Sequence, residues 1–136
     1  MKNNKSLSAV ESFTGGLFAS EIVSVPGASQ YFLGALVSYS NAIKQKLGIS
    51  THNGVINKEV ALAMAKAGNE FFGSDICVSF TGNAGPGVMD DKPAGLVYIA
   101  INDEVYELNL IGGRNSVRQE AVTFAIKKLK DMGILE

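Results

Sequence analysis

The hydrophobic positions of this chain form two kinds of pattern: helical stripes and short continuous runs. Residues 57–72 give the clearest stripe, because apolar side chains recur there three and four positions apart. Residues 115–132 carry apolar side chains on one side and predict the final helix. Two shorter helices are predicted, one from Thr14 or Gly15 to Pro26 and one from Ser40 or Asn41 to Leu47.

Short apolar runs bounded by glycines or polar residues predict the strands. They cover residues 6–10, 34–39, 75–81, 95–101 and 105–111. Only Asn102 and Asp103 separate the last two runs, which therefore predict a hairpin. Strands and helices alternate over the first two-thirds of the chain, as in α/β proteins. The expected fold is a three-layer α/β/α sandwich with a mixed β-sheet.

Length and charge narrow the functional classes. The 136 residues suffice for one domain, which we expect to span 1–136. A net charge of −1 gives no field that would recruit nucleic acid or an anionic membrane. The longest uncharged stretch, residues 22–43, is interrupted by Pro26 and polar residues and predicts no membrane span. A single cysteine excludes an internal disulfide and fits a cytoplasmic location.

Three loops of chemical interest follow predicted strands, at Ser12, Tyr39 and Thr81. Ligands of open α/β sheets bind at the carboxyl ends of strands. We therefore expect these loops to converge on one site.

Ser12 lies in the segment Glu11-Ser12-Phe13-Thr14-Gly15-Gly16, between a strand and a helix start. Backbone N–H groups at such a turn favour negative charge and could hold an oxyanion. Ser12 is thus a candidate nucleophile, although an anion-binding loop and a plain helix cap are alternatives. A serine nucleophile needs a base within hydrogen-bond reach. The only histidine, His52, lies in a polar loop and is expected at the surface.

Lys44 is the candidate base. With Asn41 as the N-cap, Lys44 takes the third helical position, where the helix dipole lowers a lysine pKa. Burial would lower that pKa further, whereas a side chain that bends into water would carry no function. Tyr39 ends a predicted strand and could relay a proton or orient the lysine, or it could simply be a half-buried strand aromatic. Ser40 is expected to cap the helix rather than to act as a nucleophile.

Two further features suit an anionic ligand. Residues 82–87 form a glycine-rich loop that could cradle an anion or amide, although it lacks a P-loop signature. Arg114 and Arg118 lie four apart and could clasp a phosphate, or simply form a solvated helix start. Asp90 and Asp91 are adjacent and face different ways, so we expect no metal site.

Several ordered motifs resemble the CinA C-terminal domain family, whose characterised members are nicotinamide-nucleotide amidohydrolases. Residues 11–16 resemble the family signature Glu-Ser-Cys-Thr-Gly-Gly, with Phe13 in place of its cysteine. The resemblance continues over nearly the whole chain, through residues 37–44, 54–57, 81–86, 92–97 and 114–119.

The resemblance implies hydrolysis of the carboxamide of nicotinamide mononucleotide to nicotinic acid mononucleotide and ammonia, with no metal or cofactor. It implies that Ser12 is the nucleophile, assisted by Lys44 and Tyr39. The substrate-binding positions that it implies are Thr14, Gly15, Gly16, Thr81, Gly82, Asn83, Gly85, Arg118 and Gln119. A non-catalytic nucleotide- or partner-binding module of the same fold is the alternative.

The resemblance also bears on assembly. The family's usual N-terminal helix is expected to be shortened or absent here, since only about ten residues precede the first motif. Loss of a covering helix would expose apolar surface, which favours a homodimer or higher oligomer. The expected partner is a small pyridine nucleotide, with neither nucleic acid nor membrane.

Overall fold

A five-stranded mixed sheet forms the centre of the protein in a computed structural model that describes residues 4–136. The strand order is β2-β1-β3-β4-β5. Strand β1 pairs in parallel with both β2 and β3, whereas β4 pairs antiparallel with both β3 and β5. Their bounds are β1 Leu7–Glu11, β2 Phe32–Val37, β3 Ile76–Gly82, β4 Leu96–Ile101 and β5 Glu104–Asn109. The predicted hairpin is confirmed by the β4–β5 pairing.

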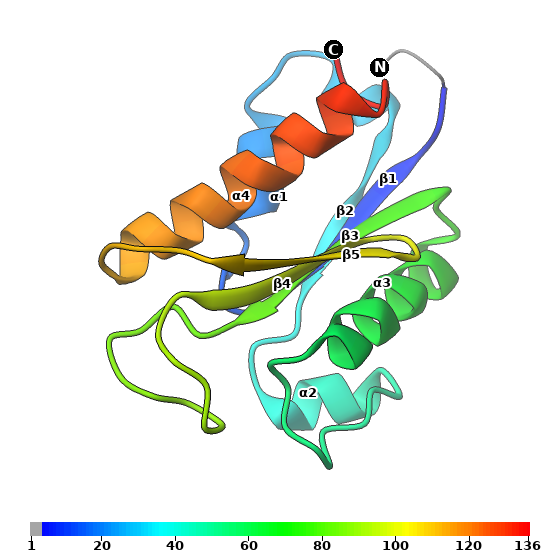
Figure 1. The fold of residues 1–136 in the computed structure, drawn as a ribbon. Helices are drawn as coiled ribbons and strands as arrows, with labels where there is room; N and C mark the ends of the chain where they lie inside the picture. The colour runs from blue at the N-terminus through cyan, green and yellow to red at the C-terminus, as the bar shows by residue number, and fades with distance from the viewer. Residues whose placement is uncertain (1–3) are drawn as a thin grey trace.

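The helices cover both faces of the sheet, as Figure 1 shows. Helices α1 (Leu17–Val23) and α4 (Arg114–Asp131) lie on one face. Helices α2 (Asn41–Lys46) and α3 (Lys58–Phe72) lie on the other. Each face has its own apolar core, one around Phe18 and Phe80 and one around Met64. The predicted α/β sandwich with a mixed sheet is confirmed.

The boundaries of two elements differ from the prediction. Helix α1 begins at Leu17 rather than at Thr14 or Gly15, because Gly15 and Gly16 have φ values of 61° and 102° and form a turn before it. Strand β2 begins at Phe32, directly after the short 3-10 helix Ala28–Gln30, and ends at Val37. The next two residues therefore belong to the loop that enters α2.

The connections place the reversal of strand order at β1. The chain leaves β1 through α1 on one face of the sheet and returns from β2 to β3 through α2 and α3 on the other. Ligands of doubly wound sheets bind at such a reversal, beyond the carboxyl ends of the strands. The end of β1 is therefore where the topology favours a site, and Ser12 follows β1 directly.

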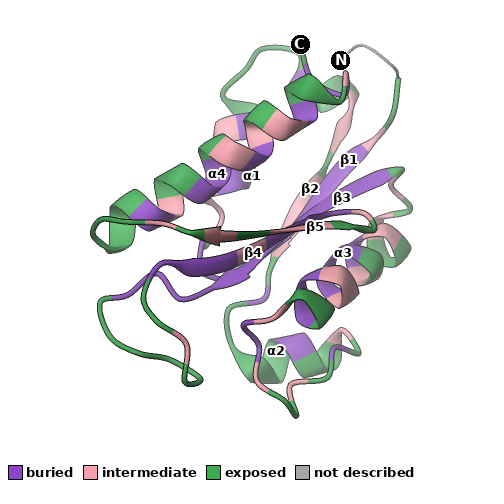
Figure 2. Ribbon diagram, in the orientation of Figure 1, coloured by how far each residue is buried: buried purple, intermediate pink, exposed green. Residues whose placement is uncertain are grey.

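Burial is greatest in the central strands, which Figure 2 shows as buried along β1 and β3. Strand β2 is an edge strand, and its Leu33 and Val37 side chains are about half exposed. Such an edge can pair with another chain, but the expected homo-oligomer stays a prediction. Among the described residues, no helix has the length and apolar character needed to cross a membrane.

Candidate functional site

A cavity of about 300 Å³ opens at the carboxyl ends of β1, β2 and β3. The three loops expected to converge do meet there, since each contributes a lining residue. The lining consists of Ser12, Phe13, Tyr39, Ser40, Asn41, Lys44, Val55, Thr81, Gly82, Asn83, Ala84, Met89 and Arg114. A larger hollow of about 670 Å³ lies between α3 and the β4–β5 turn, but none of its lining residues is buried.

The Lys44 side chain is almost completely buried at the floor of this cavity, with 1% of its surface exposed. Its Nζ lies 2.8 Å from Ser12 Oγ. It also donates to two backbone carbonyls, Ser38 O at 2.6 Å and Tyr39 O at 3.1 Å. Burial lowers the pKa of Lys44 to about 8, and the negative charge of Asp90 opposes this shift.

These contacts determine what the amine does when it loses its proton. A neutral amine has two N–H bonds and one lone pair. A carbonyl oxygen can only accept a hydrogen bond, so each of the two carbonyls binds one N–H group of the neutral amine. The lone pair then faces Ser12 Oγ. The arrangement can therefore accept the proton of the serine hydroxyl.

The capping of α2 corrects one step of the sequence interpretation. Ser40, and not Asn41, is the N-cap, and its side chain accepts a hydrogen bond of 3.2 Å from the Ile43 amide. Lys44 is therefore the fourth helical residue rather than the third. The expected lowering of its pKa is present, but burial is its main cause.

The loop after β1 is fixed by hydrogen bonds at both ends. The Ser12 amide donates to Phe80 O at 3.0 Å, which ties the loop to β3. The Gly15 amide donates to Ser12 O, and the Gly16 amide donates to the Glu11 carboxylate. These two glycine amides are therefore not free to bind an oxyanion. Among the described residues, no hydrogen bond engages the amides of Phe13 and Thr14.

Tyr39 contributes to the site through both its backbone and its ring. Its carbonyl accepts from Lys44, whereas its hydroxyl accepts from Arg114 Nη2 at 3.0 Å. Arg114 Nη1 also donates to Gly85 O at 2.6 Å. Arg114 thus links the loops that follow β2 and β3 beside the cavity. Within residues 4–136, the only charged side chains that line the cavity are Lys44 and Arg114.

The nine substrate-binding positions implied by the family motifs divide into two groups. Thr81, Gly82 and Asn83 line the cavity, whereas the other six do not. Arg118 instead donates to Phe13 O at 3.1 Å and to Thr14 O at 2.9 Å, so it supports the Ser12 loop. The six implied substrate-binding positions that do not line the cavity are Thr14, Gly15, Gly16, Gly85, Arg118 and Gln119.

Three of those positions still have a defined place in the structure. Gln119 is exposed on α4, in a hollow with Glu21 and Thr123. Gly85 contributes its carbonyl to Arg114. Thr14 is buried, and its hydroxyl has no hydrogen-bond partner within the described chain.

Sequence reasoning missed the groups that hold Lys44 and part of the cavity wall. The Ser38 carbonyl gave no signal, because every residue type carries one. Val55 and Met89 also line the cavity but carry no reactive group that a motif would single out. No cluster of three or more His, Cys, Asp or Glu that could hold a metal occurs in residues 4–136.

Together, these features define an α/β domain with a buried serine–lysine pair beside a cavity. The model of the CinA C-terminal domain family matches residues 1–132. The chain belongs to this family, as its motifs predicted.

Relatives and solved structures agree with this membership. A Shouchella clausii protein that carries the name competence-damage inducible protein is 42% identical over 128 residues, which cover 87% of this chain and 31% of that relative. The chain spans about a third of the length of such curated relatives. The competence/damage inducible protein CihA from Agrobacterium tumefaciens has a TM-score of 0.89 and 30% identity, with 96% of this chain and 86% of that chain covered. A CinA superfamily protein from Klebsiella pneumoniae 700603 has a TM-score of 0.90 and 25% identity, covering 94% of this chain and 86% of that chain.

Proposed function

We propose that the protein is an amidohydrolase that converts nicotinamide mononucleotide to nicotinic acid mononucleotide and ammonia. The observation that carries the proposal is the buried contact of 2.8 Å between Lys44 Nζ and Ser12 Oγ. The substrate class comes from the family resemblance of the motifs around these residues. The cavity supports it, because Arg114 lines it and stays cationic when Lys44 is neutral, which suits an anionic nucleotide.

In the proposed reaction, Ser12 Oγ attacks the carboxamide carbon while Lys44 Nζ takes the hydroxyl proton. The free amide of Phe13, which lines the cavity, is the proposed donor to the oxyanion. Lys44 passes its proton to the leaving nitrogen, the C–N bond breaks, and ammonia leaves. Water then attacks the Ser12 ester, again with Lys44 as base, and the serine hydroxyl is restored. Tyr39 is proposed to assist by orienting the lysine through its carbonyl.

The test is ammonia release from nicotinamide mononucleotide by the wild type and by Ser12→Ala and Lys44→Met. We expect both variants to lose at least about 1,000-fold in kcat, because nucleophile and base act as a unit. Methionine keeps most of the buried length of the lysine, so folding can be checked by circular dichroism.

Matched controls are Ser20→Ala on α1 and Lys46→Met on α2, both at exposed positions. They should retain wild-type turnover. Hydroxylamine added during turnover should yield the hydroxamate of the substrate acid, because it intercepts the serine ester. Nucleotide binding without ammonia release by the wild type would overturn the proposal in favour of a non-catalytic binding module.

The pH dependence gives a second, independent test. Lys44 must be neutral to accept a proton, and its pKa is lowered to about 8. We therefore expect kcat/KM to rise about tenfold per pH unit below pH 8 and to level off above it. A flat profile between about pH 6 and 8 would contradict the role of Lys44.

A further inference from the structure

The loop between β3 and β4 ends in a tight turn whose two central residues are aspartates. Met89 and Lys92 exchange backbone hydrogen bonds of 3.1 and 2.8 Å across it. Asp90 and Asp91, between them, have φ values of 51° and 59°. A two-residue turn of this type favours glycine, asparagine or aspartate at its central positions. Aspartate suits this turn, so the contacts of each carboxylate decide whether it has a further role.

Asp90 has such a role in the geometry of the cavity. Its Oδ2 accepts a hydrogen bond of 3.1 Å from the Val55 amide. The Val55 carbonyl accepts one of 2.6 Å from Thr81 Oγ1, at the end of β3. Val55, Thr81 and Met89 all line the cavity. Asp90 therefore joins two loops that form one wall of the site.

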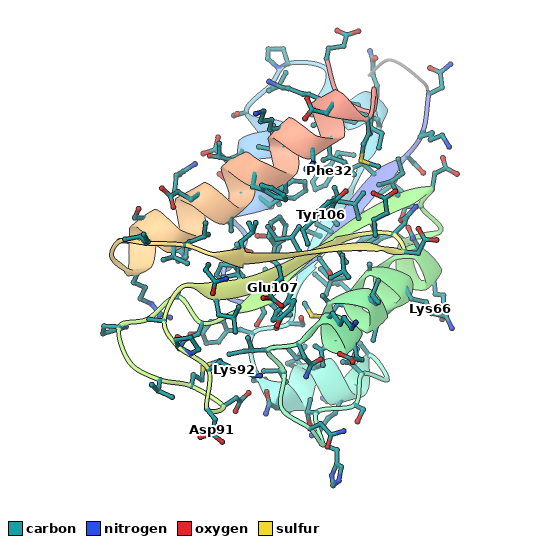
Figure 3. All side chains as sticks on the ribbon, viewed as in Figure 1. Phe32, Lys66, Asp91, Lys92, Tyr106 and Glu107 are labelled. Carbon is teal, nitrogen blue, oxygen red and sulfur yellow. The ribbon has the colours of Figure 1, made fainter. Side chains whose placement is uncertain are left out.

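Asp91 offers a contrast at the next position. It is exposed, and Figure 3 shows it at the outer end of the loop, away from the rest of the molecule. The two aspartates share the same turn, the same charge and nearly the same backbone conformation. Only Asp90 bonds to the cavity wall.

We infer that Asp90 is a positioning residue that fixes the cavity wall at Val55, and that from this fixed place its carboxylate acts through space on the amine of Lys44. The catalytic meaning of this inference rests on the proposed function, whereas the contact with Val55 does not.

The surroundings of Lys44 make the effect of this charge specific. The amine faces the Ser12 hydroxyl after β1 and the carbonyls of Ser38 and Tyr39 after β2. Arg114, at the start of α4, is the other charged residue that lines the cavity. Asp90 raises the pKa of Lys44 against the larger lowering by burial. Asp90 is itself exposed, so salt should weaken its effect.

The decisive variants are Asp90→Asn and Asp91→Asn. Both remove one charge, and asparagine suits both turn positions. In Asp90→Asn, the amide oxygen can still accept from Val55, so the wall is retained while the charge is lost. A second pair, Asp90→Gly and Asp91→Gly, removes each side chain without straining the turn.

The first measurement follows the titration of Lys44 by NMR of lysine labelled at Cε, with the signal assigned through Lys44→Met. We expect Asp90→Asn to lower the pKa of Lys44 by roughly 0.2–0.7 unit at low salt, the range that exposed ion pairs allow. Asp91→Asn should shift it by less than half as much. The pH below which kcat/KM falls should shift by the same amount as the pKa of Lys44.

The second measurement is hydrogen exchange at the Val55 amide. We expect exchange to be roughly 2–10 times faster in Asp90→Gly, as loss of one hydrogen bond predicts, and unchanged in Asp90→Asn and Asp91→Gly. Equal pKa shifts in the two asparagine variants, or equal exchange in the two glycine variants, would overturn the inference. Both measurements need no turnover, so failure of the proposed function would show separately, as absence of ammonia release by the wild type.

Discussion

The carboxylate of Glu11 is fully buried next to the candidate nucleophile, with 0% of the residue exposed. It accepts hydrogen bonds from three backbone amides, Gly16 at 3.2 Å and Phe18 and Ala19 at 3.0 Å. These amides lie at the start of α1, where a helix favours negative charge. Glu11 therefore holds both ends of the turn that carries Ser12.

Glu11→Gln tests this role. Glutamine retains one acceptor oxygen but turns a donor toward one of the three amides, and it removes the charge. We expect the free energy of unfolding to fall by about 2–3 kcal/mol, the cost of leaving a buried donor unsatisfied. Urea denaturation measures this change. Glu120→Gln, at an exposed position of α4, should stay within about 0.5 kcal/mol of the wild type; an equal effect in both variants would contradict the role of Glu11.

Some residues of the candidate site could be predicted from the sequence because their side chains carry the chemistry. Ser12 and Lys44 were singled out by residue type and by motif, and the structure places them in contact. The groups that orient Lys44 could not be predicted, because they are backbone carbonyls. Sequence spacing likewise could not tell that Arg118 bonds to the backbone of the Ser12 loop.

At the scale of elements, the helix that carries Lys44 is the weakest part of the site. Helix α2 has six residues, too few to be stable by itself. Ser40 satisfies one of its free amides at the N-terminus. The position of Lys44 in the site therefore depends on this cap and on the burial of its own side chain.

Ser40→Ala should lower the free energy of unfolding by about 1 kcal/mol, and Ser40→Asn should restore most of it, because asparagine also caps helices. Chemical denaturation of the three proteins checks this order. If the alanine and asparagine variants were equally destabilised, the loss would come from something other than the cap.

Elements were predicted more securely than their ends. The apolar stripe of α3 and the runs of β1 and β3 follow from burial, which the hydrophobic pattern reports directly. The start of α1 was placed too early because Gly15 and Gly16 form a turn with positive φ values. The pattern does not contain such backbone geometry, which depends on the hydrogen bonds of Glu11.

At the scale of the whole molecule, the alternation of strands and helices predicted the layers but not the strand order. That order puts β1 between β2 and β3, with crossovers on opposite faces of the sheet. Strands β1 and β3 pair residues that are 69 positions apart, a long-range choice that local patterns do not encode. Once the order is known, the site follows, because all three loops leave the same edge.

Burial of Lys44 also has a consequence for the stability of the whole molecule. Its pKa is about 8 in the folded protein and 10.5 as the reference value for an unperturbed lysine. Between these values the unfolded chain binds more protons than the folded protein, so stability rises with pH over this window. Each pKa unit of difference corresponds to about 1.4 kcal/mol, so the free energy of unfolding rises by about 3 kcal/mol over this window.

Lys44→Met removes this contribution and should flatten the dependence. Stability should therefore increase from pH 8 to about 10 in the wild type relative to Lys44→Met, measured by urea denaturation at closely spaced pH values. Tyr31, Tyr98 and Tyr106 have raised pKa values and oppose the rise as pH approaches 10 and exceeds it. Both proteins share these tyrosines, so the difference between the two curves isolates Lys44. Parallel curves would mean that the buried amine keeps the pKa of an exposed lysine, and only about one amine in 3,000 rather than about one in ten would be neutral at pH 7.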